Sequence, residues 1–160
     1  MKLKRVWLTC GVPGSGKSTW VQKQISKNGG VWCSRDAVRF SMISDKDEYF
    51  ACENEVFDQW VSNICSSIED PLIDDIYIDA THINDNSRKK ILNRLPRNKF
   101  ELTCVVFKVS LDTCLARNQM REGKAFVPEK VIRNMYKSFR FPKNGKIIVI
   151  NENGEEENNG

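Results

Sequence analysis

The amino-acid sequence predicts an α/β fold in which helices sandwich a five-stranded parallel sheet. Short β-branched apolar runs alternate with longer segments of helical periodicity, a pattern typical of a parallel sheet wrapped by helices. The first of these runs leads directly into the glycine-rich stretch GVPGSGKSTW. Because 160 residues can bury one substantial core, we expect one domain over residues 1–150 and a disordered acidic tail over residues 151–160.

Five apolar segments are expected to form the strands. They lie at residues 3–10, 31–34, 76–80, 100–109 and 146–150. An amphipathic helix is expected after the glycine-rich stretch, because Trp20, Val21 and Ile25 recur at helical spacing. Residues 84–95 predict a basic helix that ends before Pro96, and Asp112 is expected to cap a helix that runs towards Met120.

Two further helices are predicted from apolar residues that recur three or four positions apart. The first lies between the second and third strands, and we expect its aromatic side chains in the core rather than in a ligand site. Its stripe comprises Tyr49, Phe50, Val56, Phe57, Trp60, Val61, Ile64 and Ile68. The second is expected to open at Pro128. Its apolar face comprises Val131, Ile132, Met135, Tyr136 and Phe139.

The composition excludes several classes of protein. Six cysteines without a C-x-x-C pair and a single histidine indicate a reduced, intracellular protein without a structural zinc site, which we expect in the cytoplasm. The opening residues lack the charged-then-apolar pattern of a secretory leader. The apolar runs are short and interrupted, so we expect no membrane insertion.

The charge is unevenly distributed along the chain. Four of the 21 acidic residues and none of the 25 basic ones lie in residues 151–160, so the first 150 residues carry a net charge of +8. Basic side chains concentrate in residues 88–99 and 117–146. Such a distribution suits a polyanionic partner, and it equally suits a solvated surface.

Residues 11–18 match the pattern G-x-x-x-x-G-K-[ST] of the phosphate-binding loop, or P-loop, between a strand and a helix. Main-chain N–H groups of such a loop bind phosphate oxygens, together with the start of the following helix. Lys17 is expected to reach the β- and γ-phosphates, and Ser18 to place its hydroxyl on Mg²⁺. Thr19 is expected to support the turn or contact the α-phosphate. The pattern predicts a nucleoside triphosphate site, which kinases share with motors, switches and sensors. We expect a P-loop kinase fold with strand order 2-3-1-4-5.

Residues that follow the second strand are candidates for acceptor chemistry, because ligands of such sheets bind beyond the carboxyl ends of the strands. Asp36 and Arg39 are three residues apart and share one face of a helical turn. Asp36 is a candidate base that accepts the proton of an attacking hydroxyl. Arg39 would hold the phosphate of the acceptor or the transferring group. The alternative is that Asp36 caps the helix and Arg39 is solvated.

Asp79 closes the third strand. It is expected to hold the magnesium shell through water or to fix Arg39 by an ion pair, and the alternative is that it caps a turn. His82 has no partner visible in the sequence, and we expect it to serve packing or the surface.

The basic segment RNQMREGKAFVP at residues 117–128 is predicted to be a mobile lid. One of its arginines would close over the phosphates and stabilise the charge that spreads during transfer. The alternative is a run of surface charge.

The stretches GVPGSGKSTW, SRDAVR, IDAT and ARNQMREGKAFVPEKVIRNMYKSFR resemble the 5′-hydroxyl polynucleotide kinase domain of the T-even phage polynucleotide kinase-phosphatases. The resemblance covers residues 1 to about 140 in the same order. It implies transfer of the γ-phosphate of ATP or another NTP to the 5′-OH ends of DNA or RNA, with Mg²⁺, in nucleic-acid repair. It also implies a phage-encoded protein that acts in the cytoplasm of the host cell. The chain contains no D-x-D-G-T phosphatase motif, so we expect no 3′-phosphatase activity.

The resemblance also implies a role for individual residues. Asp36 would be the general base, Arg39 would engage the 3′-phosphate of the acceptor end, and Asp79 would organise the site. Arg121 would be the lid arginine, with Arg117 as the weaker candidate. The residues expected to bind the nucleotide are Gly11, Val12, Pro13, Gly14, Ser15, Gly16, Lys17, Ser18, Thr19, Arg117 and Arg121, and those expected to serve Mg²⁺ are Ser18 and Asp79.

Two other functions use the same residues. A P-loop kinase of a sugar, nucleoside or nucleotide-sugar, in the manner of zeta-type toxins, needs the same loop, base and lid. A regulatory module that binds NTP without turnover needs the loop alone, and it would not require a base and two arginines.

Overall fold

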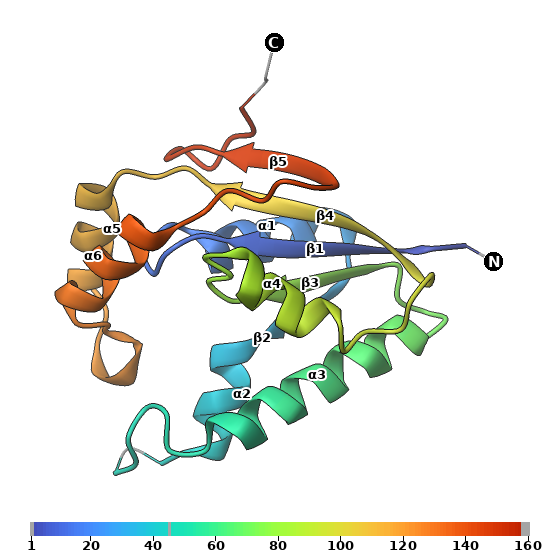
Figure 1. Ribbon diagram of the computed structural model, residues 1–160, viewed down its shortest axis with the longest axis horizontal. Coiled ribbons are helices and arrows are strands. Elements are labelled where there is room, and N and C mark those ends of the chain that lie inside the picture. The colour runs from blue at the N-terminus through green and yellow to red at the C-terminus, as the bar shows by residue number, and fades with distance from the viewer. Residues whose placement is uncertain (1, 45, 158–160) are drawn as a thin grey trace.

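Five parallel strands form one sheet in the computed structural model, which describes residues 2–44 and 46–157. The strands are β1 (Lys4–Cys10), β2 (Val31–Ser34), β3 (Asp75–Asp79), β4 (Phe100–Phe107) and β5 (Lys146–Ile150). Their order across the sheet is β2-β3-β1-β4-β5, which confirms the predicted fold and strand order (Figure 1). The predicted bounds of β2 and β5 are met, and those of the other three strands differ by one or two residues.

Helices cover both faces of the sheet because successive strand residues point to opposite sides. Val6 and Leu8 of β1 face α3 (Glu53–Glu69) and α4 (Asp85–Leu92) in the larger core cluster. Trp7 faces α1 (Lys17–Asn28), whose Trp20 and Val21 form the second cluster. The core therefore lies in two layers around β1, β3 and β4.

The remaining helices lie at the carboxyl ends of the strands. They are α2 (Arg35–Met42), α5 (Leu111–Gln119), the short 3₁₀ helix η1 (Gly123–Ala125) and α6 (Glu129–Ser138). Val12 of the P-loop packs with Cys114 of α5 and Ile132 of α6 in a third core cluster. The P-loop is therefore fixed to these two helices as well as to the sheet.

Three predicted helix boundaries need correction. The helix predicted to include Tyr49 and Phe50 begins only at Glu53, so both aromatics precede α3. Ser110, not Asp112, caps α5, because its hydroxyl accepts the backbone N–H of Thr113 at 3.2 Å. The basic helix α4 ends at Leu92 rather than at residue 95.

The segment after β5 turns back along the strand. The N–H of Glu157 donates to the carbonyl of Val149 at 2.8 Å, and Glu156 pairs with Ile150 in an antiparallel bridge. The expectation of a disordered tail is therefore wrong for residues 151–157. Residues 158–160 of that prediction lie outside the described residues.

No helix within residues 2–44 and 46–157 has the length and apolar character needed to cross a bilayer.

His82 lies in the turn after β3 and is only 4% exposed. Its Nδ1 lies 2.7 Å from the carbonyl oxygen of Thr9, and its ring stacks on Trp60 with centroids 5.8 Å apart. Nδ1–H therefore donates to that carbonyl, and the buried Nε2 has no hydrogen-bond partner among residues 2–44 and 46–157. Burial lowers the pKa of His82 to about 4, and the charges of Arg35 and Arg88 act in the same direction. The expected packing role agrees with this environment.

The neutral imidazole makes folding stability depend on pH. Since the ordinary pKa of about 6.5 falls to about 4 on folding, the unfolded chain binds more protons between these values. Stability should therefore be complete above pH 6.5 and fall by about 2 kcal/mol between pH 7 and pH 5. Because the chain has a single histidine, His82→Asn should remove this dependence in urea titrations, while Asn tolerates the φ of 42°. An equal slope in both proteins would contradict the assignment.

Candidate active site

The P-loop leaves β1 at Gly11 and enters α1 at Lys17. Gly14 and Gly16 have φ values of 84° and 93°, which residues with a side chain rarely adopt. A Cβ at Gly14 would also lie 2.4 Å from the carbonyl oxygen of Cys114, so α5 leaves no room for it. The N–H groups of the first turn of α1 have no intrahelical acceptors. The loop therefore has the backbone shape of an anion-binding site.

Lys17 folds back over the loop, and its Nζ donates to the carbonyl oxygen of Val12 at 2.9 Å. Burial lowers the pKa of the Lys17 ammonium; the negative charge of Asp79 opposes this shift and the positive charge of Arg121 adds to it. An anion bound in the loop would favour the charged form of this amine.

Asp79, at the carboxyl end of β3, accepts two hydrogen bonds through Oδ2. Both Ser18 Oγ and Trp32 Nε1 donate to it at 2.9 Å. No ion pair joins Asp79 to Arg39 in the described part of the chain, so that alternative is wrong. The Ser18 hydroxyl beside a carboxylate is a pair of hard oxygen donors. Such a pair fits Mg²⁺, which is typically held by one or two protein oxygens together with phosphates.

Asp36 is held by two neighbours that face the same cavity. Its Oδ1 accepts hydrogen bonds from the Tyr49 hydroxyl at 2.5 Å and from Nη1 of Arg39. Ser34 caps α2 instead, through its hydroxyl and the N–H of Ala37 at 3.1 Å. The alternative in which Asp36 is only a helix cap is therefore wrong.

Arg39 is 3% exposed, which rules out the solvated alternative. Its Nη2 pairs with both carboxylate oxygens of Glu53 at 2.7 and 2.8 Å, and its Nε also donates to Glu53. Nη1 donates to Tyr49 Oη at 2.7 Å, and the Tyr49 ring lies 4.1 Å from the guanidinium carbon. Burial is the largest single effect and lowers the pKa of Arg39, but the hydrogen bonds that Arg39 donates to Glu53 and the nearby negative charges of Asp36 and Glu53 together raise it. All its N–H groups are thus engaged with protein.

Three residues of this site were missed in the sequence. Tyr49 was placed on a core helix, although the polar residues SDKDE before it are typical of a loop. Glu53 opens α3, where an acidic residue is usual and carries no signal of an arginine partner. Trp32 fits the apolar pattern of a strand, and nothing in the sequence indicates that its indole N–H donates a hydrogen bond to Asp79.

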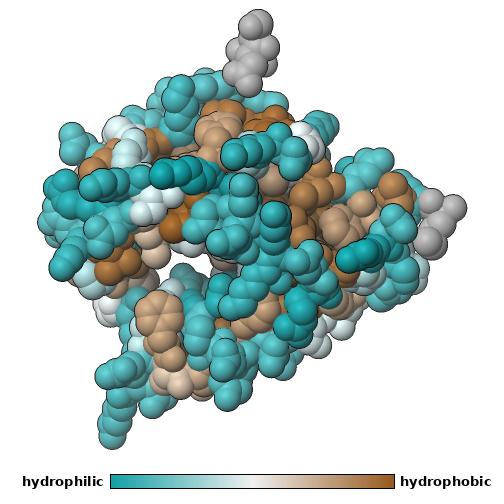
Figure 2. All heavy atoms as spheres, in the orientation of Figure 1, coloured by the Kyte–Doolittle hydropathy of each residue, from teal (hydrophilic) through white to brown (hydrophobic). Residues whose placement is uncertain are grey.

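A cavity of about 570 Å³ lies between the P-loop, α2, α6 and the end of β3. In Figure 2 the molecule is open at this place, to the left of its centre. The predicted residues that line this large cavity are Pro13, Lys17, Ser18, Asp36, Arg39, Asp79 and Arg121. Tyr49 and the 67% exposed Phe50 line it too, which corrects their expected place in the core.

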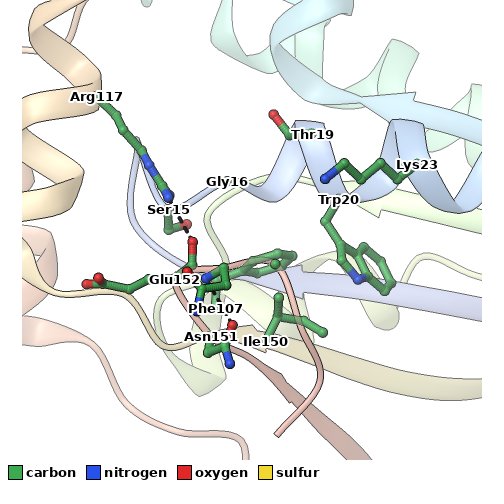
Figure 3. A pocket seen from close by; sticks show the side chains of 12 residues that line it. Ser15, Gly16, Thr19, Trp20, Lys23, Phe107, Arg117, Ile150, Asn151 and Glu152 are labelled. Atoms are coloured by element: carbon green, nitrogen blue, oxygen red, sulfur yellow. Dashed lines mark hydrogen bonds between the residues drawn. The ribbon is translucent and has the colours of Figure 1, made fainter.

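A smaller cavity of about 270 Å³ lies on the other side of the P-loop, beside the turn after β5. Figure 3 shows Arg117 of α5 extending towards the P-loop and this turn. Its Nη1 donates to Gly14 at 3.3 Å and its Nη2 to the carbonyl of Glu152 at 3.0 Å. The predicted residues that line this small cavity are Ser15, Gly16, Thr19 and Arg117. The two lid arginines therefore serve different cavities.

The predicted lid segment, residues 117–128, reaches over the large cavity. Nζ of Lys124 donates to the carbonyl oxygens of Ser44 and Asp47, in the connection between α2 and α3. Arg121 is exposed, lines the large cavity, and donates weakly to Ala125 at 3.5 Å. A cationic side chain thus lines the same cavity as Asp36 and Lys17 and forms no ion pair within the part of the chain that the structure describes.

Several solved structures share this fold. A sugar kinase from Janibacter sp. HTCC2649 has a TM-score of 0.64 and 15% identity, over 94% of this chain and 86% of that chain. A chain of the Pnkp1/Rnl/Hen1 RNA repair complex has a TM-score of 0.72 and 20% identity, over 86% of this chain and 44% of that chain. A gluconokinase from Sinorhizobium meliloti 1021 has a TM-score of 0.60 and 15% identity, over 94% and 84%. This chain thus spans less than half of the RNA repair protein.

A family model described as an AAA domain matches residues 6–142. The match includes most of β1, the P-loop, Asp36, Asp79 and the lid segment. Together with the strand order, it supports a nucleotide-binding fold of the kinase type. The chain therefore belongs to this AAA domain family of P-loop proteins.

Proposed function

We propose that the protein is an ATP-dependent phosphotransferase that acts on the 5′-hydroxyl ends of polynucleotides. The observation that carries the proposal is the position of Asp36, which lines the same cavity as Lys17 and Ser18 of the P-loop. A candidate base and a triphosphate site thus face one space, as phosphoryl transfer to a hydroxyl requires.

The nucleotide is expected to lie across the P-loop. Its nucleoside would occupy the small cavity beside Thr19 and Arg117, and its terminal phosphate would point into the large cavity. Main-chain N–H groups and Lys17 would bind the β- and γ-phosphates. Mg²⁺, held by Ser18 and Asp79, would neutralise phosphate charge. Arg121 would stabilise the charge on the γ-phosphoryl oxygens during transfer.

Asp36 would take the proton from the acceptor hydroxyl, whose oxygen then bonds to the γ-phosphorus. The bond between that phosphorus and the β-γ bridging oxygen breaks, and the nucleoside diphosphate leaves. The Tyr49 hydroxyl and Arg39 hold Oδ1 of Asp36, which leaves Oδ2 to accept the proton. Because Arg39 is fully engaged by Glu53, Asp36 and Tyr49, we propose that it positions the base. The role that the resemblance implies, binding the acceptor's 3′-phosphate, stays a prediction.

Two observations favour a polynucleotide as the acceptor. The first 150 residues carry a net charge of +8, and one structural neighbour is a chain of an RNA repair complex. A small hydroxyl compound is the second candidate, because a sugar kinase and a gluconokinase share the fold. The retained base and arginines argue against a module that only binds NTP.

The proposed function is tested by incubating the protein with γ-³²P-ATP, Mg²⁺ and a 5′-OH oligonucleotide. We expect the label on the oligonucleotide and none on a 5′-phosphorylated control of the same sequence. Label that appears only on sugars or nucleosides would establish the second candidate instead. Binding of ATP without transfer to any acceptor would contradict a phosphotransferase.

Asp36→Asn should lower the rate of transfer by about 10²- to 10⁴-fold, because it removes the proton acceptor. Its ATP affinity should stay within about threefold, since no hydrogen bond or ion pair joins Asp36 to the P-loop among the described residues. Single-turnover rates and a fluorescent ATP analogue measure the two effects. Asp74→Asn is the matched control, because Asp74 is exposed at the opposite ends of the strands. Equal loss of transfer and of ATP affinity would show that Asp36 is structural.

A further inference from the structure

Helix α4 and the turn after it present a basic surface that the proposed mechanism does not use. Lys89, Lys90, Arg94 and Arg97 are exposed there. Within residues 2–44 and 46–157, no carboxylate lies within ion-pair distance of Lys89, Lys90 or Arg97. Arg94 has one carboxylate partner, Asp58, at 3.4 Å, and both side chains are at least half exposed. Such an exposed pair contributes little.

Three cations from different parts of the chain gather around the ring of Phe57. Nζ of Lys90 lies 4.7 Å from the ring centroid, and the guanidinium carbons of Arg35 and Arg94 lie at 5.3 and 5.6 Å. Arg35 also lines the large cavity, whereas Lys90 lies on the exposed side of α4 and Arg94 is exposed in the turn after it. We call these three residues the cation row. It leads from the large cavity to the outer surface.

The protein neutralises this row only in part. Glu53 pairs with Arg35, but the same carboxylate also binds the buried Arg39. Asp58 forms only a weak, exposed ion pair with Arg94, and Lys90 has no carboxylate partner among the described residues. The buried Nε of Arg35 has no hydrogen-bond partner either. Three like charges around one ring repel one another, and a chain of phosphates would relieve that repulsion.

We propose that the cation row binds backbone phosphates of a single-stranded acceptor, downstream of the end that lies in the large cavity. This inference rests on the proposed function and gives its substrate class, because a sugar or nucleoside would not reach Lys90 or Arg94. A positively charged path that follows the backbone and carries no base contacts binds without strong sequence preference. The surface of α4 therefore selects for length and charge of the acceptor, not for its sequence.

The test compares the double variant Lys90→Ala/Arg94→Ala with the wild type, and with Lys27→Ala/Lys146→Ala as a charge-matched control. Lys27 lies at the end of α1 and Lys146 begins β5, and both are exposed away from the row. Anisotropy of a 20-nucleotide single strand, labelled at its 3′ end, gives affinity as a function of NaCl. Removing two phosphate contacts should reduce the magnitude of the log–log salt slope by about 1.4. The control should keep the wild-type slope.

Kinetics separate the row from the reaction itself. The double variant should raise the KM for a 5′-OH 20-mer by about tenfold and leave the KM for a nucleoside 3′-monophosphate within about twofold. Equal effects on the KM of both acceptors, or no effect on the KM of the 20-mer, would overturn the proposed role of the cation row. The kinase assignment would stand in either case. If the wild type phosphorylates neither acceptor, the proposed function fails. The salt slope then tests phosphate binding by the cation row on its own. An unchanged slope overturns this binding role, and a reduced slope supports it.

Discussion

The ion pair between the buried Arg39 and the partly exposed Glu53 is the constraint on which the candidate site depends. It joins α2 to the start of α3 and fixes the guanidinium group that holds Asp36. A buried arginine must keep its partner, because an uncompensated charge in such a position costs about 3–5 kcal/mol. Tyr49, from the connection between these helices, accepts a hydrogen bond from Arg39 and donates one to the carboxylate of Asp36. The geometry of Asp36 therefore follows from packing and charge pairing rather than from its own rotamer.

The opposite wall of the large cavity is fixed by different means. The P-loop is held by the N–H of Gly11, which donates to Thr81 at 2.8 Å, and by the close approach of Gly14 to α5. Ser18 and Trp32 fix the carboxylate of Asp79 between these two walls. Backbone contacts thus position the proposed triphosphate side, whereas side-chain charges position the proposed acceptor side. Such preorganised dipoles and charges are what phosphoryl transfer requires of a protein.

The fold and the P-loop could be predicted because their signals are local. The strands follow from short apolar runs, and residues 11–18 carry their motif in consecutive positions. Tyr49 and Phe50 were misplaced because their spacing continues the apolar period of α3, and periodicity alone does not mark where a helix begins. Glu53 and Trp32 owe their place in the site to partners 14 and 47 residues away, which no local pattern encodes.

The turn after β5 shows a second limit of composition. Acidic and asparagine-rich residues suggested disorder, yet the carbonyl of Glu152 accepts a hydrogen bond from Arg117 and the turn lines the small cavity. Hydrogen bonds to β5 supply order that hydrophobicity does not predict. Residues 151–154, which composition alone predicts to be disordered, line the small cavity in which we propose that the nucleoside binds.

The most direct test of this account is a crystal structure of the protein with a non-hydrolysable ATP analogue, Mg²⁺ and a short 5′-OH oligonucleotide. We expect the 5′-oxygen within about 2.6–3.2 Å of the Asp36 carboxylate, with Arg39 still bound to Glu53. A 5′-end bound outside the large cavity, or a terminal phosphate on the far side of the P-loop from Asp36, would contradict it.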